Sequence, residues 1–422
     1  MQRLIVAVLL SAATASCLAQ WETSGQLRSQ WDEARAADAG PLAAANLIAP
    51  GTAPLSSGGA TVQTELHASR PGFKAVVTLQ SKRPQGGATT TQAWVNELVA
   101  SHDAGAWQFA AGKKVLAWDV GYGFRPNDMV QQEERRSFAS SAAPGRAMLV
   151  AEHFTADTAW SLVWVNPSAE RARRGAQEPA LAARVYRRDG ALDWHGFARL
   201  GAHTGPGLGA ALAWVATDAL ELHGSWRYQR RVDTRGMAPS NTLLPTNPWQ
   251  ANSADHVQQL LVGGTWTHAS QLSVLAEAWW DGAALSDAQW REWGQRNQHL
   301  AALQSKGPPA DAIAGNLAWQ ADAFGAASNL RRGNVFVRLS WQNGAWQPAL
   351  DLLYTPADAG RLVTASLTWQ GDRVTVQGGA RASAGPRAAV LRQLPNHVQQ
   401  YVNVTFFPKT ARADRGHPWA LS

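Results

Sequence analysis

The sequence predicts an all-β protein, namely a transmembrane antiparallel up-and-down β-barrel of about 18 strands with short periplasmic turns and long extracellular loops. Three observations lead to this fold class. Apolar and polar residues alternate over many short segments, and the gaps between these segments are alternately short and long. After the N-terminal segment, no apolar run reaches the roughly 18 residues that a membrane-spanning helix requires.

Residues 1–19 are expected to be a secretory signal peptide. Arg3 supplies a positive charge, and residues 4–10 (LIVAVLL) form an apolar core that is too short to span a bilayer. The small residues before Gln20 suit cleavage by a signal peptidase, although Cys17 could instead be the acylated residue of a lipoprotein. Because Cys17 is the only cysteine, its removal would leave an exported chain without disulfides, which must be held together by sheet closure or by a large core.

Alternation with a period of two residues is the main signal for strands. In residues 73–82, for example, Val77 and Leu79 fall on one face, and Lys74, Thr78 and Gln80 fall on the other. Most segments are close to the 9–11 residues of a tilted transmembrane strand, although 92–101 and 145–155 do not settle on one apolar face. The predicted strands are 23–31, 62–70, 73–83, 92–101, 106–117, 145–155, 158–166, 179–188, 191–201, 207–216, 219–230, 255–267, 271–281, 333–342, 345–355, 361–370, 373–382 and 398–407.

The gaps between the predicted strands sort into two kinds. Every second gap is a tight turn, such as Asp189-Gly190 or Asn343-Gly344, whose residues tolerate a positive φ. The other gaps are often long, as at 118–144 and 282–332. This sorting is typical of outer-membrane barrels, and an even number of strands places both chain termini on the periplasmic side, where the short turns lie. The expected organisation is therefore a signal peptide at 1–19, a barrel at 20–407 and a periplasmic tail at 408–422.

Composition indicates which surroundings and partners to expect. The 21 tryptophans suit the two membrane–water interfaces, so outer-membrane lipids and lipopolysaccharide are expected neighbours. The net charge of +7 favours anionic partners, such as lipopolysaccharide phosphates or acidic sugars. Nucleic acid is not expected as a partner of an exported chain.

The predicted inward faces carry charges of both signs, with an excess of basic residues. A basic, water-filled lumen would attract anions, whereas a ladder of inward salt bridges would instead brace a plugged barrel, and the sequence leaves both interpretations open. The predicted lumenal cations are Arg28, Lys74, Lys82, Lys114, Arg184, Arg199, Arg227, Arg338, Arg373 and Arg381. The predicted lumenal anions are Glu65, Glu97, Asp193, Glu221, Glu277 and Asp351.

The gap at 118–144 is the most distinctive loop, because it combines aromatic residues, glycines and both charge signs. It could fold into the barrel and narrow the pore, or it could pack on its own aromatic residues outside. In the first case its arginines could hold acidic groups in a bidentate manner. The candidate solute-binding residues of this loop are Asp119, Arg125, Asp128, Arg135 and Arg136.

Residues 112–128 resemble part of a known family. Gly112-Lys113-Lys114, followed by the loop WDVGYGFRP, is similar to the fifth strand and following loop of alginate-export-type outer-membrane barrels, which also have about eighteen strands. The resemblance implies an arginine-rich lumen that passes an anionic polysaccharide, with Lys114 and Arg125 as pore residues. It also implies a periplasmic export complex as a partner.

Residues 282–332 differ in kind from the strands. Ser286-Asp287-Ala288-Gln289 predicts a capping box, and Trp290 and Trp293 then fall on one face of a helix with Leu300 and Leu303. A second short helix is expected within 311–324. These helices could cover the extracellular mouth, could bind another component, or could simply pack against the rim.

The function expected from these features is a channel for small or oligomeric, anionic solutes such as acidic saccharides. A scaffold barrel and an outer-membrane lipid-modifying enzyme are the alternatives. His67, His195 and His223 are the enzyme candidates, but no nucleophile motif accompanies them, so no enzymatic activity is expected. The sequence shows no metal-ligand spacing, and no cofactor is expected.

Overall fold

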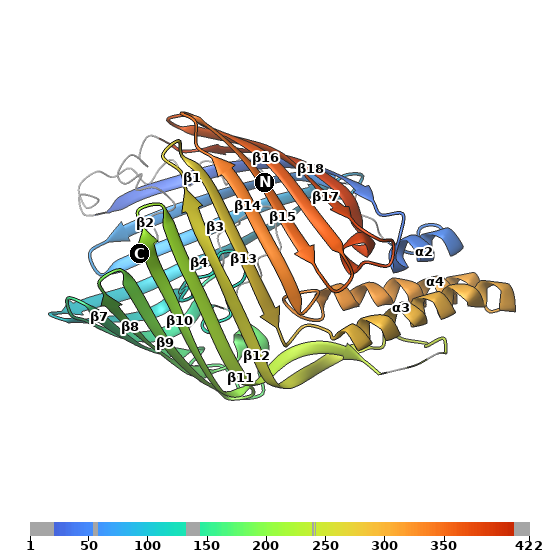
Figure 1. The fold of residues 1–422 in the computed structure, drawn as a ribbon, viewed down its shortest axis with the longest axis horizontal. Coiled ribbons are helices and arrows are strands. Elements are labelled where there is room, and N and C mark those ends of the chain that lie inside the picture. The colour runs from blue at the N-terminus through green and yellow to red at the C-terminus, as the bar shows by residue number, and fades with distance from the viewer. Residues whose placement is uncertain (1–20, 54–57, 132–143, 239, 241, 409–422) are drawn as a thin grey trace, which may run out of the picture.

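The computed structural model describes residues 21–53, 58–131, 144–238, 240 and 242–408. They form a closed antiparallel barrel of 18 strands, in which β1 pairs with both β2 and β18 (Figure 1). The first nine strands are β1 (Glu22–Ala36), β2 (Gly58–Arg70), β3 (Phe73–Pro84), β4 (Thr90–Ala104), β5 (Trp107–Lys114), β6 (Arg146–Phe154), β7 (Thr158–Val165), β8 (Ala180–Asp189) and β9 (Leu192–Gly201). The others are β10 (Gly205–Thr217), β11 (Leu220–Met237), β12 (Trp249–Thr267), β13 (Leu272–Asp281), β14 (Gly333–Trp341), β15 (Trp346–Thr355), β16 (Gly360–Gln370), β17 (Val374–Ala384) and β18 (Asn396–Phe406).

The predicted fold class is confirmed, and each of the eighteen predicted segments overlaps one strand. The largest difference is at β11, and its partner β12 also extends beyond its predicted segment; these two strands are 18 and 19 residues long. Both strands continue beyond the barrel wall as a two-stranded ribbon, which curves away from the barrel in Figure 1. The predicted signal peptide, the tail beyond Pro408 and the loop residues 132–143 lie outside the described residues.

The outer face of the barrel is apolar, as a lipid-facing surface must be. Side chains such as Trp160, Leu162 and Leu208 are more than half exposed, which would be unfavourable in water but suits contact with acyl chains. Trp266, Trp341 and Trp346 lie where strands meet the short turns, as the aromatic residues of a membrane interface do. None of the helices in the described part of the chain combines the length and the apolar character that a membrane span would need.

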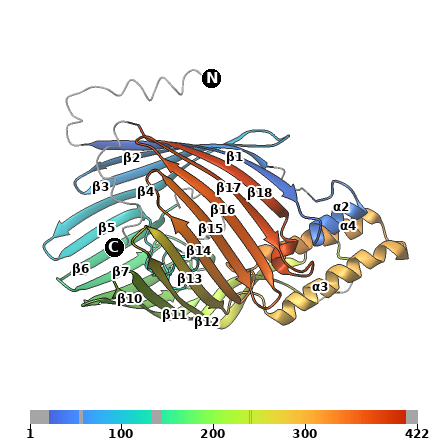
Figure 2. The same cartoon turned by 45° about the horizontal axis from the view of Figure 1, so that its top comes forward.

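Helices gather at the end of the barrel that carries the long loops (Figures 1 and 2). In the described part of the chain they are α2 (Pro41–Ile48), α3 (Asp287–Ala302) and α4 (Ala310–Trp319), with four short 3-10 turns, η1 (Gly175–Gln177), η2 (Leu303–Lys306), η3 (Gln320–Gly325) and η4 (Val390–Gln393). The predicted capping box at Ser286 is present, and Trp290 and Trp293 are buried on α3. Ala45 of α2, a helix that the sequence pattern did not predict, packs with Leu300 and Ile313. These helices project beyond the barrel wall in both views.

The inner face of the barrel is not uniformly polar, and the prediction of a polar inner face is wrong for part of β5 to β9. Polar residues such as Glu152 and Ser161 also lie on this inner face, but many of its side chains are small or apolar, as at Met148, Val150, Val163 and Phe197. They form one cluster with the segment between β5 and β6, which includes Trp118, Met129 and Val130. Where these strands meet this segment, both of their faces are therefore apolar, because one faces lipid and the other faces the segment.

Candidate functional site

The segment between β5 and β6 lies inside the barrel; its described part, residues 115–131, is called the internal loop below. Trp118 stacks on Phe197 of β9 with ring centroids 6.3 Å apart. Tyr122 stacks on Phe336 of β14 at 5.9 Å. Because β14 is nine strands away from β5 in a closed barrel of 18, the internal loop reaches the opposite wall. It thereby crosses the lumen.

Asn127 fixes the internal loop to β10 and β11. Its side-chain amide donates to the Ser225 hydroxyl at 2.8 Å, to the Trp226 carbonyl at 3.1 Å and to the Ala210 carbonyl at 3.3 Å. A Cβ atom on the inward-facing Gly209 would overlap the Asn127 side chain, so only glycine permits this approach. The loop is thus seated directly on the strand backbone.

Glu277 of β13 forms the second anchor of the internal loop. One carboxylate oxygen accepts the backbone N–H of Tyr122 and the other accepts that of Gly123, both at 2.6 Å. The first oxygen also lies 3.0 Å from His223 Nε2, and His223 Nδ1 lies 3.1 Å from Glu221. The Glu277 side chain is fully buried, so its charge is satisfied entirely by these neighbours.

Asp119 and Asp128, both predicted to bind solute, instead brace the internal loop. Asp119 accepts hydrogen bonds from the backbone N–H of Asn127 and from the Ser225 hydroxyl, at 2.5 and 3.0 Å. Asp128 accepts the backbone N–H of Trp118 at 2.9 Å. Both carboxylates are thereby occupied by groups of the protein, so they present little to a passing solute.

The tip of the internal loop meets a basic cluster on the facing wall, formed by Arg338 of β14, Asp351 of β15 and Arg381 of β17. Arg338 donates to Asp351 at 3.1 Å, and its guanidinium lies 5.8 Å from the centre of the Tyr122 ring. Arg381 donates to Thr364 at 3.0 Å and interacts electrostatically with Asp351. Two arginines thus share one carboxylate, which leaves the cluster with a net positive charge.

The remaining predicted site residues separate into different places. Lys114 lies at the root of the internal loop, 3.6 Å from Glu152. Arg125 donates to the Gly121 carbonyl at 2.7 Å within the loop, and Arg227 donates to the Pro126 carbonyl at 2.9 Å. Arg373 does not join them. Arg373 is exposed in the turn before β17, outside the strand in which it was predicted, and Arg135 and Arg136 lie outside the described residues.

Arg199 also departs from its predicted role, because it is buried in an ion pair. It donates to Glu178 at 2.9 Å, and their side chains are 3% and 0% exposed. Glu178 also accepts the backbone N–H groups of His203 and Thr204. Burial alone would raise the pKa of Glu178, but Arg199 and the two N–H groups outweigh burial and hold this pKa below its ordinary value. Glu178 thereby ties the loop before β8 to β9 and to the loop that follows β9.

Salt bridges are frequent among the lumenal side chains, as expected from the interpretation in which inward salt bridges brace the barrel. Besides Arg338 and Lys114, Lys74 pairs with Glu97 at 2.5 Å. The sequence reasoning did not select Asn127, Tyr122 or Thr364 as site residues, although the first two belong to the loop that it singled out. The roles of Asn127 and Tyr122 depend on contacts between segments about 80 to 210 residues apart, for which the alternation pattern carries no signal. Thr364 contacts Arg381 on the neighbouring strand, which depends on the exact register of the two strands.

A closed antiparallel sheet with an apolar outer face, aromatic residues at its turn end and long loops at the other end defines an outer-membrane β-barrel. Its 18 strands are the number found in barrels of the porin and channel type.

Comparisons with solved structures agree with this class. OccK8 (OprE) from Pseudomonas aeruginosa aligns with a TM-score of 0.55 and 9% identity, over 92% of this chain and 98% of that chain. OccAB1 from Acinetobacter baumannii aligns with a TM-score of 0.54 and 10% identity, over 92% and 96% of the two chains. At such low identity the likeness is one of fold alone. No profile of a known protein family matches the chain, and no curated protein sequence matches it.

Proposed function

We propose that this barrel is a channel that passes small polar solutes and prefers anions. The passage would run beside the internal loop, along the wall formed by β15–β18 and β1–β4, because the loop rests on β14 and apolar packing occupies the space between the loop and β5 to β9. The observation that carries the proposal is the contact of Tyr122, at the loop tip, with the net positive cluster of Arg338, Asp351 and Arg381. A solute that passes the loop tip would pass this cluster.

The chemistry of the cluster also indicates which solute the channel would pass. The cluster offers guanidinium donors, which suit carboxylates and other flat anions. Together with the resemblance of residues 112–128 to alginate-export-type barrels, this favours acidic saccharides, as single units or short oligomers. Secretion of the protein across the inner membrane would rely on residues 1–19 as a signal peptide. If the channel exports saccharides, it would also require a periplasmic complex that delivers them. Many lumenal charges are paired, so we expect a moderate preference for anions rather than a strict one.

Planar-bilayer recording tests the proposal. The refolded protein should produce discrete conductance steps, with a reversal potential displaced toward that of the anion under a salt gradient. Replacing both Arg338 and Arg381 with glutamine should remove most of that displacement, whereas Asp351→Asn should increase it. Arg361, an exposed outward-facing residue of β16, provides the matched control, because Arg361→Gln removes one charge from the outside of the barrel. A barrel that inserts but never conducts would refute the channel and favour a scaffold.

A further inference from the structure

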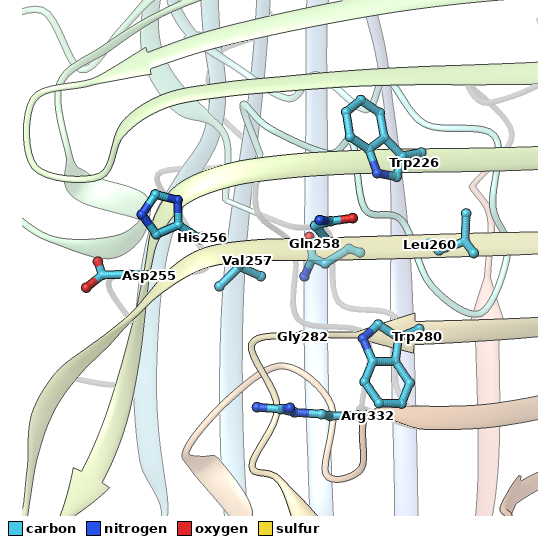
Figure 3. A pocket seen from close by; sticks show the side chains of 10 residues that line it. Trp226, Asp255, His256, Val257, Gln258, Leu260, Trp280, Gly282 and Arg332 are labelled. Carbon is cyan, nitrogen blue, oxygen red and sulfur yellow. The ribbon is translucent and has the colours of Figure 1, made fainter.

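A pocket of about 500 Å³ opens on the outer wall of the barrel, away from the lumen. It lies over β11, β12 and β13, close to the long-loop end (Figure 3). Its position on the lipid-facing side follows from three of its lining residues, Trp226, Leu260 and Trp280, which are 40% to 48% exposed on the outer face. Long loops mark the extracellular side of outer-membrane barrels, so this pocket faces the outer leaflet.

The outward residues of β12 change from apolar to polar at the pocket. Trp226, Leu260 and Trp280 are paired in register on neighbouring strands and form one row across β11, β12 and β13. Toward the short turns, the next outward residue of β12 is the exposed Val262. Toward the long loops, the next ones are Gln258 and the exposed His256. Tryptophan side chains favour the membrane–water boundary, which places this boundary at the pocket.

Arg332, in the segment before β14, provides the positive charge of the pocket. Its Nε donates to the Ala284 carbonyl at 3.0 Å, and its guanidinium lies 6.0 Å from the centre of the Trp280 ring. Figure 3 shows the Arg332 side chain beside Trp280 at the edge of the pocket. These two contacts orient the guanidinium before any ligand arrives, which reduces the entropy that binding would cost.

His256 is held at the polar edge of the pocket by an uncommon backbone conformation. Its φ is +53°, in the left-handed region that residues other than glycine seldom adopt. The β11–β12 register is the same on both sides of His256, with Gln229 opposite Val257 and Arg231 opposite Asp255, but His256 itself is not paired with a residue of β11. Its Nδ1 lies 2.8 Å from the Tyr228 hydroxyl. The one carboxylate of the pocket, Asp255, is paired with Arg231 at 3.2 Å, so it does not cancel the charge of Arg332.

We propose that this pocket binds a phosphorylated, multiply acylated glycolipid of the outer leaflet, that is, the lipid part of lipopolysaccharide. Arg332, with His256 at the rim, would hold a phosphate group, and acyl chains would lie against Trp226, Leu260 and Trp280. The pocket matches this chemistry because it places an oriented cation directly above an apolar, lipid-facing floor. The inference is independent of conduction, since the pocket lies outside the lumen.

Native mass spectrometry of the refolded barrel in detergent tests the assignment. The probe is a bis-phosphorylated, hexa-acylated lipid A, compared with the same lipid after enzymatic removal of its phosphates and with phosphatidylglycerol. The wild-type barrel should bind the phosphorylated lipid A most tightly. Arg332→Gln should weaken that binding about tenfold, as expected for the loss of a charge-assisted hydrogen bond. Loss of the phosphates should have a similar effect, and Arg332→Lys should retain part of the binding.

Arg361→Gln is the matched control, because Arg361 is also exposed on the outer face near the long loops but does not line the pocket. It should bind lipid A as the wild type does. Each variant must first show the gel-mobility shift of a folded barrel on heating. If Arg332→Gln does not fold, His256→Ala takes its place, and we expect it to weaken the binding of lipid A by a smaller factor. Equal binding by Arg332→Gln and Arg361→Gln would overturn the proposal. So would equal binding of phosphatidylglycerol, or displacement of lipid A by millimolar inorganic phosphate.

Discussion

Glu277 holds the internal loop through two short backbone hydrogen bonds, so Glu277→Gln should loosen the loop without emptying the space around it. A hydrogen bond to a charged group contributes about 1.5–3 kcal/mol. Glutamine keeps the volume of glutamate, but its amide nitrogen would face a donor N–H of Tyr122 or Gly123. We therefore expect docking of the loop to weaken by about 2–4 kcal/mol, which corresponds to a 30- to 1,000-fold larger undocked population.

Hydrogen exchange measures this change directly, because exchange of a protected backbone amide follows the population of the opened state. In Glu277→Gln, the amides of residues 118–128 should exchange roughly 30 to 1,000 times faster than in the wild type. Strand amides on β1 and β18 should be unaffected. Glu221→Gln is the matched control. Glu221 contacts the same histidine, His223, but the N–H groups of the loop donate to Glu277 and not to Glu221. Equal exchange of the loop amides in the two variants would refute the anchoring role of Glu277.

Three other substitutions test separate parts of the structure. Gly209→Leu should force Asn127 off the strand wall and raise exchange in the internal loop, as read by mass spectrometry, while unchanged protection would contradict the close approach. Because the pKa of Glu178 is depressed in the folded state, its pair with Arg199 stabilises the barrel fully above about pH 4.5, and this stabilisation is lost as the pH falls through the folded-state pKa. Thermal unfolding should show the loss as a lower unfolding temperature in acid, and Glu178→Gln should remove this pH dependence. Ser286→Ala removes the helix cap and should destabilise the start of α3 by about 1 kcal/mol, seen as faster exchange there, with equal rates arguing against the cap.

The strands could be predicted because each must face lipid on one side, which imposes an alternation that the sequence displays. The same reasoning gave the turns, since tight turns at the periplasmic end need residues such as Asn343 and Gly344. Ser286 could be recognised because a capping box is a local pattern within four residues. In each case a short stretch of chain carries the whole signal.

The site could be predicted only in part, because its geometry depends on contacts between distant segments. The segments 92–101 and 145–155 failed to show one apolar face, and the structure explains the second of these. Leu149 faces lipid, while Met148 and Val150 face the internal loop. A strand with two apolar faces therefore indicates that a segment of the chain packs inside the barrel. The burial of Arg199 could not be foreseen, since Glu178 belongs to a loop with no alternation.

Helix α2 was missed for a related reason. Its sequence, PLAAANLI, is short and apolar almost all around, so it shows no amphipathic period. It is stabilised by packing of Ala45 against Leu300 and Ile313, which are more than 250 residues away in the chain. Tertiary contact rather than local preference fixes this helix.

The central claim is that the internal loop crosses the lumen and rests against β14 while solutes pass beside it. Conductance of the double variant Tyr122→Cys, Phe336→Cys, recorded before and after treatment with a short bifunctional thiol cross-linker, tests it most directly, because the two replaced rings stack with centroids 5.9 Å apart. We expect the cross-link to form and the open-channel conductance to stay the same, since the cross-link would fix the loop where it already lies. Failure of the cross-link to form, or a large fall in conductance when it forms, would contradict the account.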